Sequence, residues 1–462
     1  MLFNSRIFLF VFLPIVYFVF WRLQTRDQRY IWLTLSGYTF YGYWDWRFCG
    51  LMLFSTLVSY IAGIRLSRAS SPKRRKLFLV VPIAIDLALL GVFKYAGFAL
   101  ASTQRLAHLL GFSMTAPALH IILPVGISFY TFHTITYIVD SYRGVIQPTR
   151  NFFEFSCYVS LFSQLVAGPI VRFRQIENDL ENIDQTGRTT YLNLGWSFFA
   201  IGLFEKVLLA DTISSVIDPA LAQYQRLSTW DAWLCMLGYS YQLYFDFSGY
   251  SSMAVGLGYL FGLRLPQNFN SPYKATDPSD FWARWHISLS TVLRDYLYIP
   301  LGGNRGSSWK TSRNLMITML LGGLWHGASW TFVLWGGYHG LLLVAYRRFR
   351  NRWDTAPHNI RVAGMFLAAM LGWVFFRCES FHMAIVILQT MFSWRDGILL
   401  PGLGGFSIAL VIAAWWAHFG PNPFEMKHEW KSWNLAGVCG LFALALLLVA
   451  SGNESPFLYF QF

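Results

Sequence analysis

The sequence predicts an all-α polytopic membrane protein, and its composition carries that prediction. Of its 462 residues, 55% are hydrophobic and only 13% are charged, and the mean hydropathy is +0.41. A soluble globular protein carries roughly 25% charged residues, so about half of the expected charge is missing. One soluble domain of this length cannot cover so much apolar surface, which excludes soluble enzymes and disordered scaffolds.

Apolar runs follow one another along the whole chain. They lie near residues 7–21, 30–44, 50–66, 77–100, 119–139, 153–171, 192–217, 231–262, 314–346, 361–376, 381–394, 404–419 and 434–450. At about 20 residues per span they allow roughly nine to twelve crossings. Whether 153–171 crosses stays open, and the polar connection 172–191 is expected to form a surface amphipathic segment.

The basic balance of the chain has a membrane explanation. The formal net charge is +13, and Lys and Arg gather in short loops, as they do in cytoplasmic loops of membrane proteins. Two spans separate the basic loops 22–29 and 65–76, so both loops can face the cytoplasm, which places the N-terminus outside. No small-residue cleavage site follows the run 7–21, so we expect a retained span. No basic patch is interleaved with aromatic residues, which argues against a nucleic-acid partner.

The five cysteines are scattered and show no CxxC spacing. An odd number at such spacings predicts neither a disulfide framework nor a zinc site. We therefore expect small core residues and no metal centre.

Ionisable residues inside apolar runs are costly, so each is a candidate site. They are Asp86, Lys94, His133, Asp140, Glu205, Lys206, Asp246, His286, Arg294, Asp295, His326 and His339. Most are expected to have structural roles, and Glu205 and Lys206 are expected at a helix end. Asp86 and Asp246 are harder to explain, because apolar residues flank each of them on both sides.

Residues 281–296 combine a histidine, a hydroxyl and a cation among tryptophans. On a helix, His286 and Ser290 are four residues apart and share a face. Arg294 lies one turn further on the same side. This stripe predicts a lined cavity, and the alternative is an interfacial helix whose polar face meets lipid headgroups.

Residues 315–346 contain no Lys, Arg, Asp or Glu but hold two histidines, His326 and His339. On a straight helix these two would lie about 220° apart. The pairs Gly323/Gly327 and Gly336/Gly340 have the small-xxx-small spacing that lets helices approach closely. A packed core histidine is the alternative to a functional His326.

Buried histidine suits two kinds of chemistry. A neutral imidazole, with an ordinary pKa of about 6.5, can take a proton from a hydroxyl and pass it on. That serves acyl transfer from a thioester to an alcohol, and it also serves a proton relay in a transporter. Signatures of soluble enzymes, such as the GxSxG elbow, the Walker loop and HExxH, are missing.

Several motifs together resemble the membrane-bound O-acyltransferase family. They are 123–132 (LPVGISFYTF), 244–250 (YFDFSGY), 268–273 (NFNSPY), 281–290 (FWARWHISLS), 293–305 (LRDYLYIPLGGNR), 320–330 (LLGGLWHGASW) and 456–462 (PFLYFQF). They run nearly end to end. The resemblance is to the bacterial branch that contains the alginate O-acetyltransferase membrane subunit and the D-alanyl transferase of teichoic acids.

The resemblance implies one integral membrane domain over residues 1–462, with a motif-bearing core at about 120–346. It implies a bundle of roughly eleven transmembrane helices plus re-entrant helices around a central tunnel. The Trp-His-Gly histidine, His326, is the catalytic residue of the family, and His286 faces the same tunnel. Trp325, Ser290, Arg294, Asp246 and His133 are expected to line or support it. His133 stands where many relatives have Gln, and the chain lacks a sizeable soluble insertion between its late spans.

The resemblance also implies an inner-membrane O-acetyltransferase subunit without a bound cofactor. It would take acetyl from a cytoplasmic thioester, acetyl-CoA first, for O-acetylation of an extracytoplasmic polysaccharide, with alginate first and cellulose or peptidoglycan next. The expected partners are a periplasmic protein of serine-hydrolase-like fold, the polysaccharide export machinery and the lipid bilayer. D-alanyl transfer to teichoic acid from a carrier protein, a proton-coupled transporter and a non-enzymatic scaffold stay open as alternatives.

Overall fold

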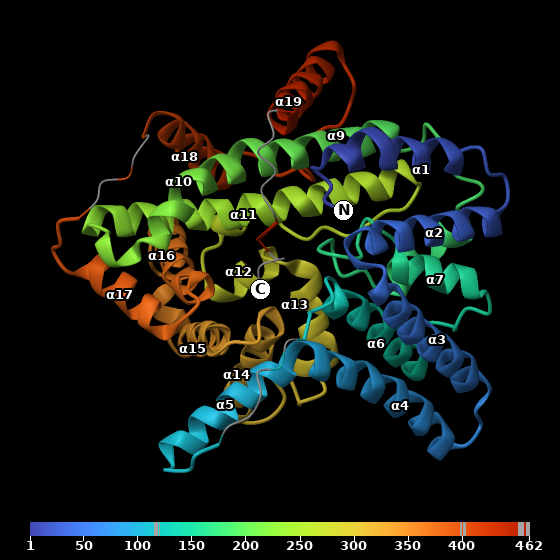
Figure 1. Ribbon diagram of the computed structural model, residues 1–462, viewed down its shortest axis with the longest axis horizontal. Helices are drawn as coiled ribbons and strands as arrows, with labels where there is room; N and C mark the ends of the chain where they lie inside the picture. The colour runs from blue at the N-terminus through green and yellow to red at the C-terminus, as the bar shows by residue number, and fades with distance from the viewer. Residues whose placement is uncertain (115–118, 120, 398–399, 401–402, 451–456, 459–462) are drawn as a thin grey trace. The chain divides into compact units, whose positions relative to one another are not determined.

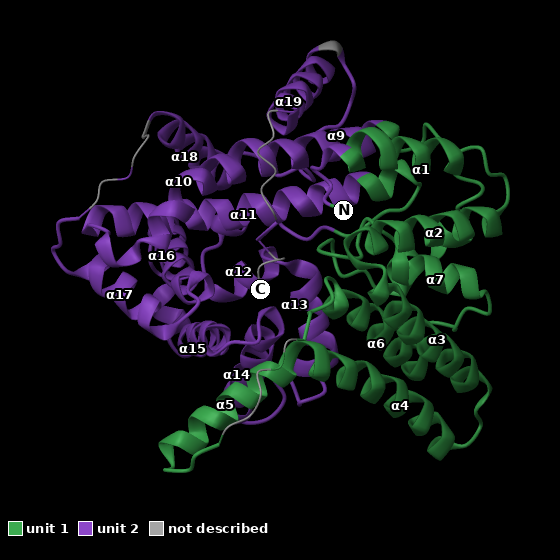
Figure 2. Cartoon of the chain, viewed as in Figure 1, with its two compact units in different colours: residues 1, 7–192, 257–266 green, residues 2–6, 193–256, 267–462 purple. Residues whose placement is uncertain are grey.

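The computed structural model describes residues 1–114, 119, 121–397, 400, 403–450 and 457–458. Within these ranges the chain forms helices joined by turns and loops and no strand, which confirms the all-α prediction. The chain forms two compact units (Figure 2). The first comprises residues 1, 7–192 and 257–266, and the second comprises 2–6, 193–256 and 267–462.

The first unit is built from helices of very different lengths. They are α1 (Leu13–Phe20), α2 (Arg26–Asp45), α3 (Arg47–Arg68), α4 (Pro72–Leu90), α5 (Ala96–Leu109), α6 (Ile127–Arg143), α7 (Phe152–Ser160) and α8 (Phe173–Glu181). The run 153–171 is helical only as α7, whose nine residues are too few to cross a bilayer as a helix. In α8, Phe173, Ile176 and Leu180 are buried, so the amphipathic prediction for this part of 172–191 is confirmed.

The second unit holds the remaining helices (Figure 1). They are α9 (Leu192–Phe204), α10 (Asp211–Ala222), α11 (Thr229–Leu260), α12 (Pro278–Arg284), α13 (Ile287–Leu293), α14 (Ser308–His326), α15 (Trp330–Trp353), α16 (His358–Arg377), α17 (Phe381–Phe392), α18 (Leu403–His418) and α19 (Ser432–Ala450). A π-helical turn, Glu205–Ala210, joins α9 to α10.

Among the described residues, four helices are long and apolar enough to cross a membrane by length and composition. They are Arg47–Arg68, Pro72–Leu109, His358–Arg377 and Trp433–Ala450. Other long helices carry polar residues in their interior: α11 has 32 residues and includes Asp246 and several serines. A hydropathy criterion therefore detects helices that face lipid more easily than it detects helices that line the interior of the protein. The protein is a multi-pass membrane protein, and the count of crossings stays a prediction.

The cysteine prediction is confirmed for three positions. Cys157, Cys235 and Cys378 are buried, and all five cysteines are free thiols. Cys439 is exposed, so the expectation of a core residue is wrong there. It lies on α19, of which only 11% of the stretch Trp433–Ala450 is buried.

The loop-linked helices α14 and α15 pack through their glycines, as the small-xxx-small spacing predicts. A Cβ at Gly323 would overlap the carbonyl oxygen of Phe332, and one at Gly336 would overlap that of Met319. Only glycine permits this backbone approach. The close contact fixes the end of α14, where His326 stands.

Changing Gly336 to alanine is expected to destabilise the protein by about 1–3 kcal/mol, because the new methyl group meets backbone that cannot move aside. Gly337→Ala is the matched control, since a Cβ there meets only the Leu320 side chain at 3.4 Å. Thermal unfolding of both variants in detergent measures the difference. Equal unfolding temperatures for the two variants would contradict the close packing.

A second glycine contact brings α9 against α11, which run side by side in Figure 1. A Cβ at Gly249 would lie 2.6 Å from the carbonyl oxygen of Gly202, so the two backbones nearly touch. Glu205 and Lys206 follow directly after α9 and are buried in the middle of a longer helical stretch. The expectation that they stand at a helix end is therefore wrong, because the π-helical turn continues the helix into α10.

Candidate functional site

His326 is the last residue of α14, and local sequence explains why the helix ends there. Gly327 takes an extended conformation, with φ −155° and ψ 146°. Two residues later, Ser329 caps α15 by accepting a hydrogen bond from the Thr331 amide. The break turns two apolar helices into a hairpin and places the His326 imidazole beside their junction, buried to 4% exposure.

His286 does not lie on a helix, so the prediction that it shares a helical face with Ser290 is wrong. The chain leaves α12 after Arg284 and enters α13 at Ile287, and His286 adopts the left-handed conformation with φ 43° and ψ 53°. A non-glycine residue there is strained and persists only where surrounding structure holds it. Such strain in a buried histidine marks a candidate functional position.

Residues 268–270 hold the turn at His286 in place, and this segment is called the strap. The Asn268 carbonyl accepts from the Ile287 amide at 2.9 Å, and the Asn270 amide donates to the Arg284 carbonyl at 2.9 Å. The Asn268 side-chain oxygen accepts from the Ser288 amide at 3.2 Å and from its hydroxyl at 2.8 Å. Its amide nitrogen donates to Ser251 of α11 at 3.0 Å. The strap therefore ties both flanks of His286 to α11.

The two histidines belong to one aromatic cluster. Their ring centroids lie 6.2 Å apart. The His286 ring also lies 4.7 Å from Phe247, and the His326 ring lies 5.0 Å from Trp335. His286 is fully buried. Two imidazoles held this close by rigid rings form a site that can move a proton on and off a bound group.

The other predicted residues of the second unit lie at different distances from this pair. The Trp325 ring is 5.9 Å from His286 and 5.0 Å from His326, so it lines the cluster. The Ser290 hydroxyl donates to the Trp285 carbonyl at 3.2 Å and helps to close the turn around His286. Arg294 pairs with Asp295 at 2.7 Å and its side chain is 59% exposed, so the predicted stripe ends before it.

Asp246 is part of a buried ion network. Its carboxylate lies 2.6 Å from the Lys206 ammonium, which also lies 2.6 Å from Asp211. The second Asp246 oxygen accepts from the amide of Leu458 at 3.0 Å. Within the closing motif only residues 457 and 458 are described, and the Phe457 ring lies 5.8 Å from Phe247. Asp246 therefore contacts Lys206 and the Leu458 backbone and lies next to Phe247 in the chain.

Two further buried histidines are His133 and His339. His133 belongs to the first unit, on α6, where it is fully buried with its ring 5.5 Å from Tyr158. His339, on α15, is also fully buried, and its ring lies 5.0 Å from Trp335. Trp335 therefore stands between His339 and His326. No group of three metal-binding side chains occurs among the residues that the structure describes.

Asn268→Ala is expected to lower kcat about 10²-fold while the protein stays folded, because a shift of about 1 Å in a catalytic group costs that much. The change removes both Ser288 contacts and frees the turn at His286. Asn270→Ala is the control, since its side chain contacts Asn422 and its backbone bond to Arg284 remains. Steady-state transfer rates at matched folded amounts test the difference, and equal rates for the two variants would contradict the role of Asn268.

Sequence reasoning assigned no supporting role to two residues, Asn268 and Lys206. Asn268 appeared only inside a motif, and no local pattern pointed to its bonds. Lys206 had a usable signal: a carboxylate such as Asp246 inside an apolar run needs a cation, and Lys206 lies in the apolar run just before it along the chain.

Several known proteins are similar in sequence to this chain. Residues 145–395 match the membrane-bound O-acyltransferase family. The chain is 39% identical to the "probable alginate O-acetylase AlgI" of Pseudomonas putida over the full length of both chains. It is 36% identical to the peptidoglycan O-acetyltransferase of Helicobacter pylori over 85% of this chain and 80% of the relative. It is 27% identical to the teichoic acid D-alanyltransferase of Bacillus subtilis over 58% of this chain and 71% of the relative.

Proposed function

Because the chain belongs to the membrane-bound O-acyltransferase family, we propose that it is the membrane subunit of a polysaccharide O-acetylation system. It takes acetyl from a cytoplasmic thioester, acetyl-CoA, and passes it across the inner membrane. The acetyl group then modifies hydroxyls of an extracytoplasmic polysaccharide, alginate first and cellulose or peptidoglycan next. The relatives that act on alginate and peptidoglycan support this order.

One observation carries the proposal: His326 ends α14 with its ring 6.2 Å from that of the strained His286. In the proposed step, His326 takes the proton from an acceptor hydroxyl as its oxygen attacks the thioester carbon. The carbon–sulfur bond breaks, and the imidazolium returns the proton to the sulfur of the leaving CoA. The products are an acetyl ester and the free thiol, so atoms and charge balance.

The proposal includes the wider architecture. All of residues 1–462 form one integral membrane domain, with roughly eleven spans and re-entrant helices around a tunnel that brings donor and acceptor to His326. The N-terminus lies on the periplasmic side. A periplasmic partner of serine-hydrolase-like fold completes the transfer beside the polysaccharide export machinery. Family membership makes the chain an acyltransferase, which sets the transporter and scaffold alternatives aside.

Reconstituted protein tests the proposal directly. Liposomes that hold the purified chain receive labelled acetyl-CoA, with a periplasmic extract as the source of acceptors. We expect release of CoA and transfer of label by the parent protein and not by protein-free liposomes. Transfer from a D-alanyl carrier protein in place of acetyl-CoA would assign the chain to teichoic acid modification. Transfer from neither donor would contradict the proposed activity.

A further inference from the structure

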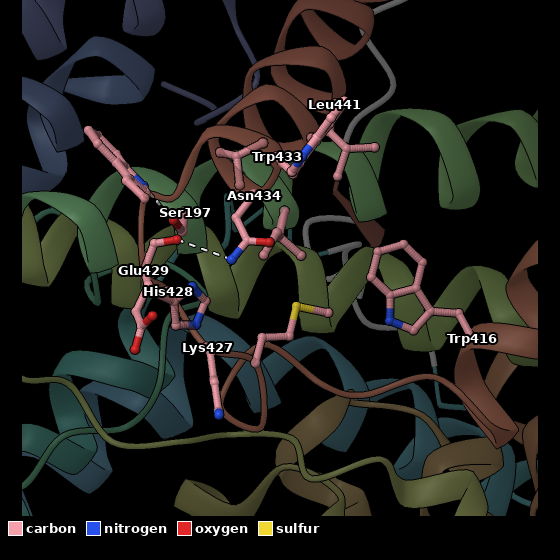
Figure 3. A pocket seen from close by; sticks show the side chains of 13 residues that line it. Ser197, Trp416, Lys427, His428, Glu429, Trp433, Asn434 and Leu441 are labelled. Carbon is pink, nitrogen blue, oxygen red and sulfur yellow. Dashed lines mark hydrogen bonds between the residues drawn. The ribbon is translucent and has the colours of Figure 1, made fainter.

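The second unit holds a cavity that is not part of the histidine cluster. Its volume is about 440 Å³, and it is bounded by α9, α18, the connection 420–431 and α19 (Figure 3). Its apolar walls include Ile201, Trp416, Met426, Trp433, Val438 and Leu441. Neither His286 nor His326 lines it. The volume falls within the range of small-molecule sites, roughly 300–1,000 Å³. Apolar walls with a few polar groups are also typical of such sites.

One wall of this cavity is α19, a helix that is largely exposed on the surface of the protein. The stretch Trp433–Ala450 has a mean hydropathy of 2.1, and only 11% of it is buried. Its outer faces must meet lipid, because such an apolar surface is not stable in water. A molecule that reaches the cavity along α19 therefore comes from the bilayer.

The walls are fixed by their own hydrogen bonds. The Trp430 indole donates to Ser197 on α9 at 3.2 Å, and the Trp416 indole donates to the Pro421 carbonyl at 3.0 Å. The Asn434 amide donates to the Glu429 carbonyl at 3.2 Å, a bond drawn dashed in Figure 3. The cavity is thus preformed, and tryptophan at a helix end is typical of the membrane interface.

The rim carries one net positive charge. Glu429 is neutralised by Lys431 at 2.7 Å. Burial lowers the pKa of His428, so this imidazole is neutral at pH 7, and it bonds to the Pro423 carbonyl at 2.7 Å. Lys427 lines the cavity and has no recorded hydrogen bond or ion pair with the described part of the chain.

We propose that this cavity binds an anionic phospholipid of the surrounding bilayer, with an acyl chain between α9 and α19 and the phosphate at Lys427. An apolar slot that opens along a lipid-exposed helix accepts the chain, and the unpaired ammonium at its rim selects the negative headgroup. The bound lipid would fill the space between α19 and the rest of the unit. This inference is independent of the proposed acetyl transfer.

Cavity-filling variants test the acyl-chain part. Gly437 lines the cavity, and a Cβ there meets no atom within 4 Å, so Gly437→Leu is chosen to place a side chain in the cavity. Gly440→Leu is the matched control, because this residue is on the same helix, has equally open surroundings and lies outside the cavity. Native mass spectrometry of the full chain, titrated with dioleoyl phosphatidylglycerol, reports the bound lipid. We expect at least tenfold weaker binding for Gly437→Leu and unchanged binding for Gly440→Leu.

The headgroup part has its own pair of variants. Titration with dioleoyl phosphatidylcholine is expected to show weaker binding than phosphatidylglycerol in the parent. Lys427→Gln is expected to reduce that preference about fivefold, because one basic residue near an anionic headgroup contributes about that factor to binding. The double variant Lys431→Gln/Glu429→Gln removes the ion pair as a whole and leaves the net charge of the rim unchanged, so it is the matched control and is expected to keep the preference.

Three results would overturn the proposal. Equal phosphatidylglycerol binding by Gly437→Leu and the parent would exclude this cavity as the site. Equal binding of the two lipids by the parent would exclude headgroup selection. A dimer in the parent that Gly437→Leu dissociates would assign the cavity to a second copy of the chain.

Discussion

His326→Ala is expected to lower acetyl transfer about 10²–10⁴-fold, the usual contribution of a general base. The imidazole is buried, stands at a helix end and lies within one cluster with His286. No other described side chain of α14 could replace it in the cluster as a base, since Trp325 carries only an indole donor. The loss should appear in kcat, because the ring acts on the reacting proton.

The control for this experiment is His339→Ala. His339 is also buried and contacts the same Trp335 ring as His326, and it stands on α15, the other helix of the hairpin. Loss of its imidazole therefore disturbs packing to a similar extent without removing the proposed base. The liposome assay with labelled acetyl-CoA compares both variants at matched folded amount. Equal losses for the two would show that packing, and not proton transfer, explains the effect.

The helical class and the α14–α15 contact could be predicted from sequence because both depend on local patterns. Apolar runs with little charge exclude a soluble fold, and glycines spaced four apart mark a helix face that another helix can approach. Gly323 and Gly336 do make that approach. Local sequence alone favoured a packed core histidine at 326 and left an interfacial helix open at 286, and the resemblance to the family added the functional interpretation of both.

The conformation of His286 could not be predicted because distant residues impose it. Residues 285–287 contain neither glycine nor proline, so a helix through them was the natural expectation. The strap at Asn268 and Asn270 instead pairs with both flanks of the histidine. These tertiary hydrogen bonds outweigh the local helical preference, and they hold the ring where the helix would have turned it away.

The buried ion network could be predicted only in part. Intramembrane Asp246 needs a cation, but its partner lies 40 residues earlier along the chain, and the pairing depends on how closely two helices approach. The Gly202–Gly249 contact supplies that approach. Once the helices touch, the Lys206 ammonium lies within 2.6 Å of both Asp246 and Asp211.

Lys206→Met is expected to destabilise the protein by about 3–5 kcal/mol, because it leaves two carboxylates in a buried place without their shared cation. The Lys206 and Asp246 side chains are each 2% exposed, and Asp211 is 12% exposed. Asp246→Asn should cost far less. Lys206 keeps Asp211 as its partner, and the asparagine oxygen can still accept the Leu458 amide.

The double variant Lys206→Met/Asp246→Asn distinguishes this electrostatic cause from a loss of packing. It removes one of the two uncompensated carboxylates, so its unfolding temperature in detergent should lie between those of Lys206→Met and the parent. If Lys206→Met acted through packing, the stability losses of the two single variants would add. The double variant would then be less stable than either single variant. Transfer activity should follow the same order, because Asp246 binds the amide of Leu458 beside Phe457. The Phe457 ring contacts Phe247, and the Phe247 ring contacts His286.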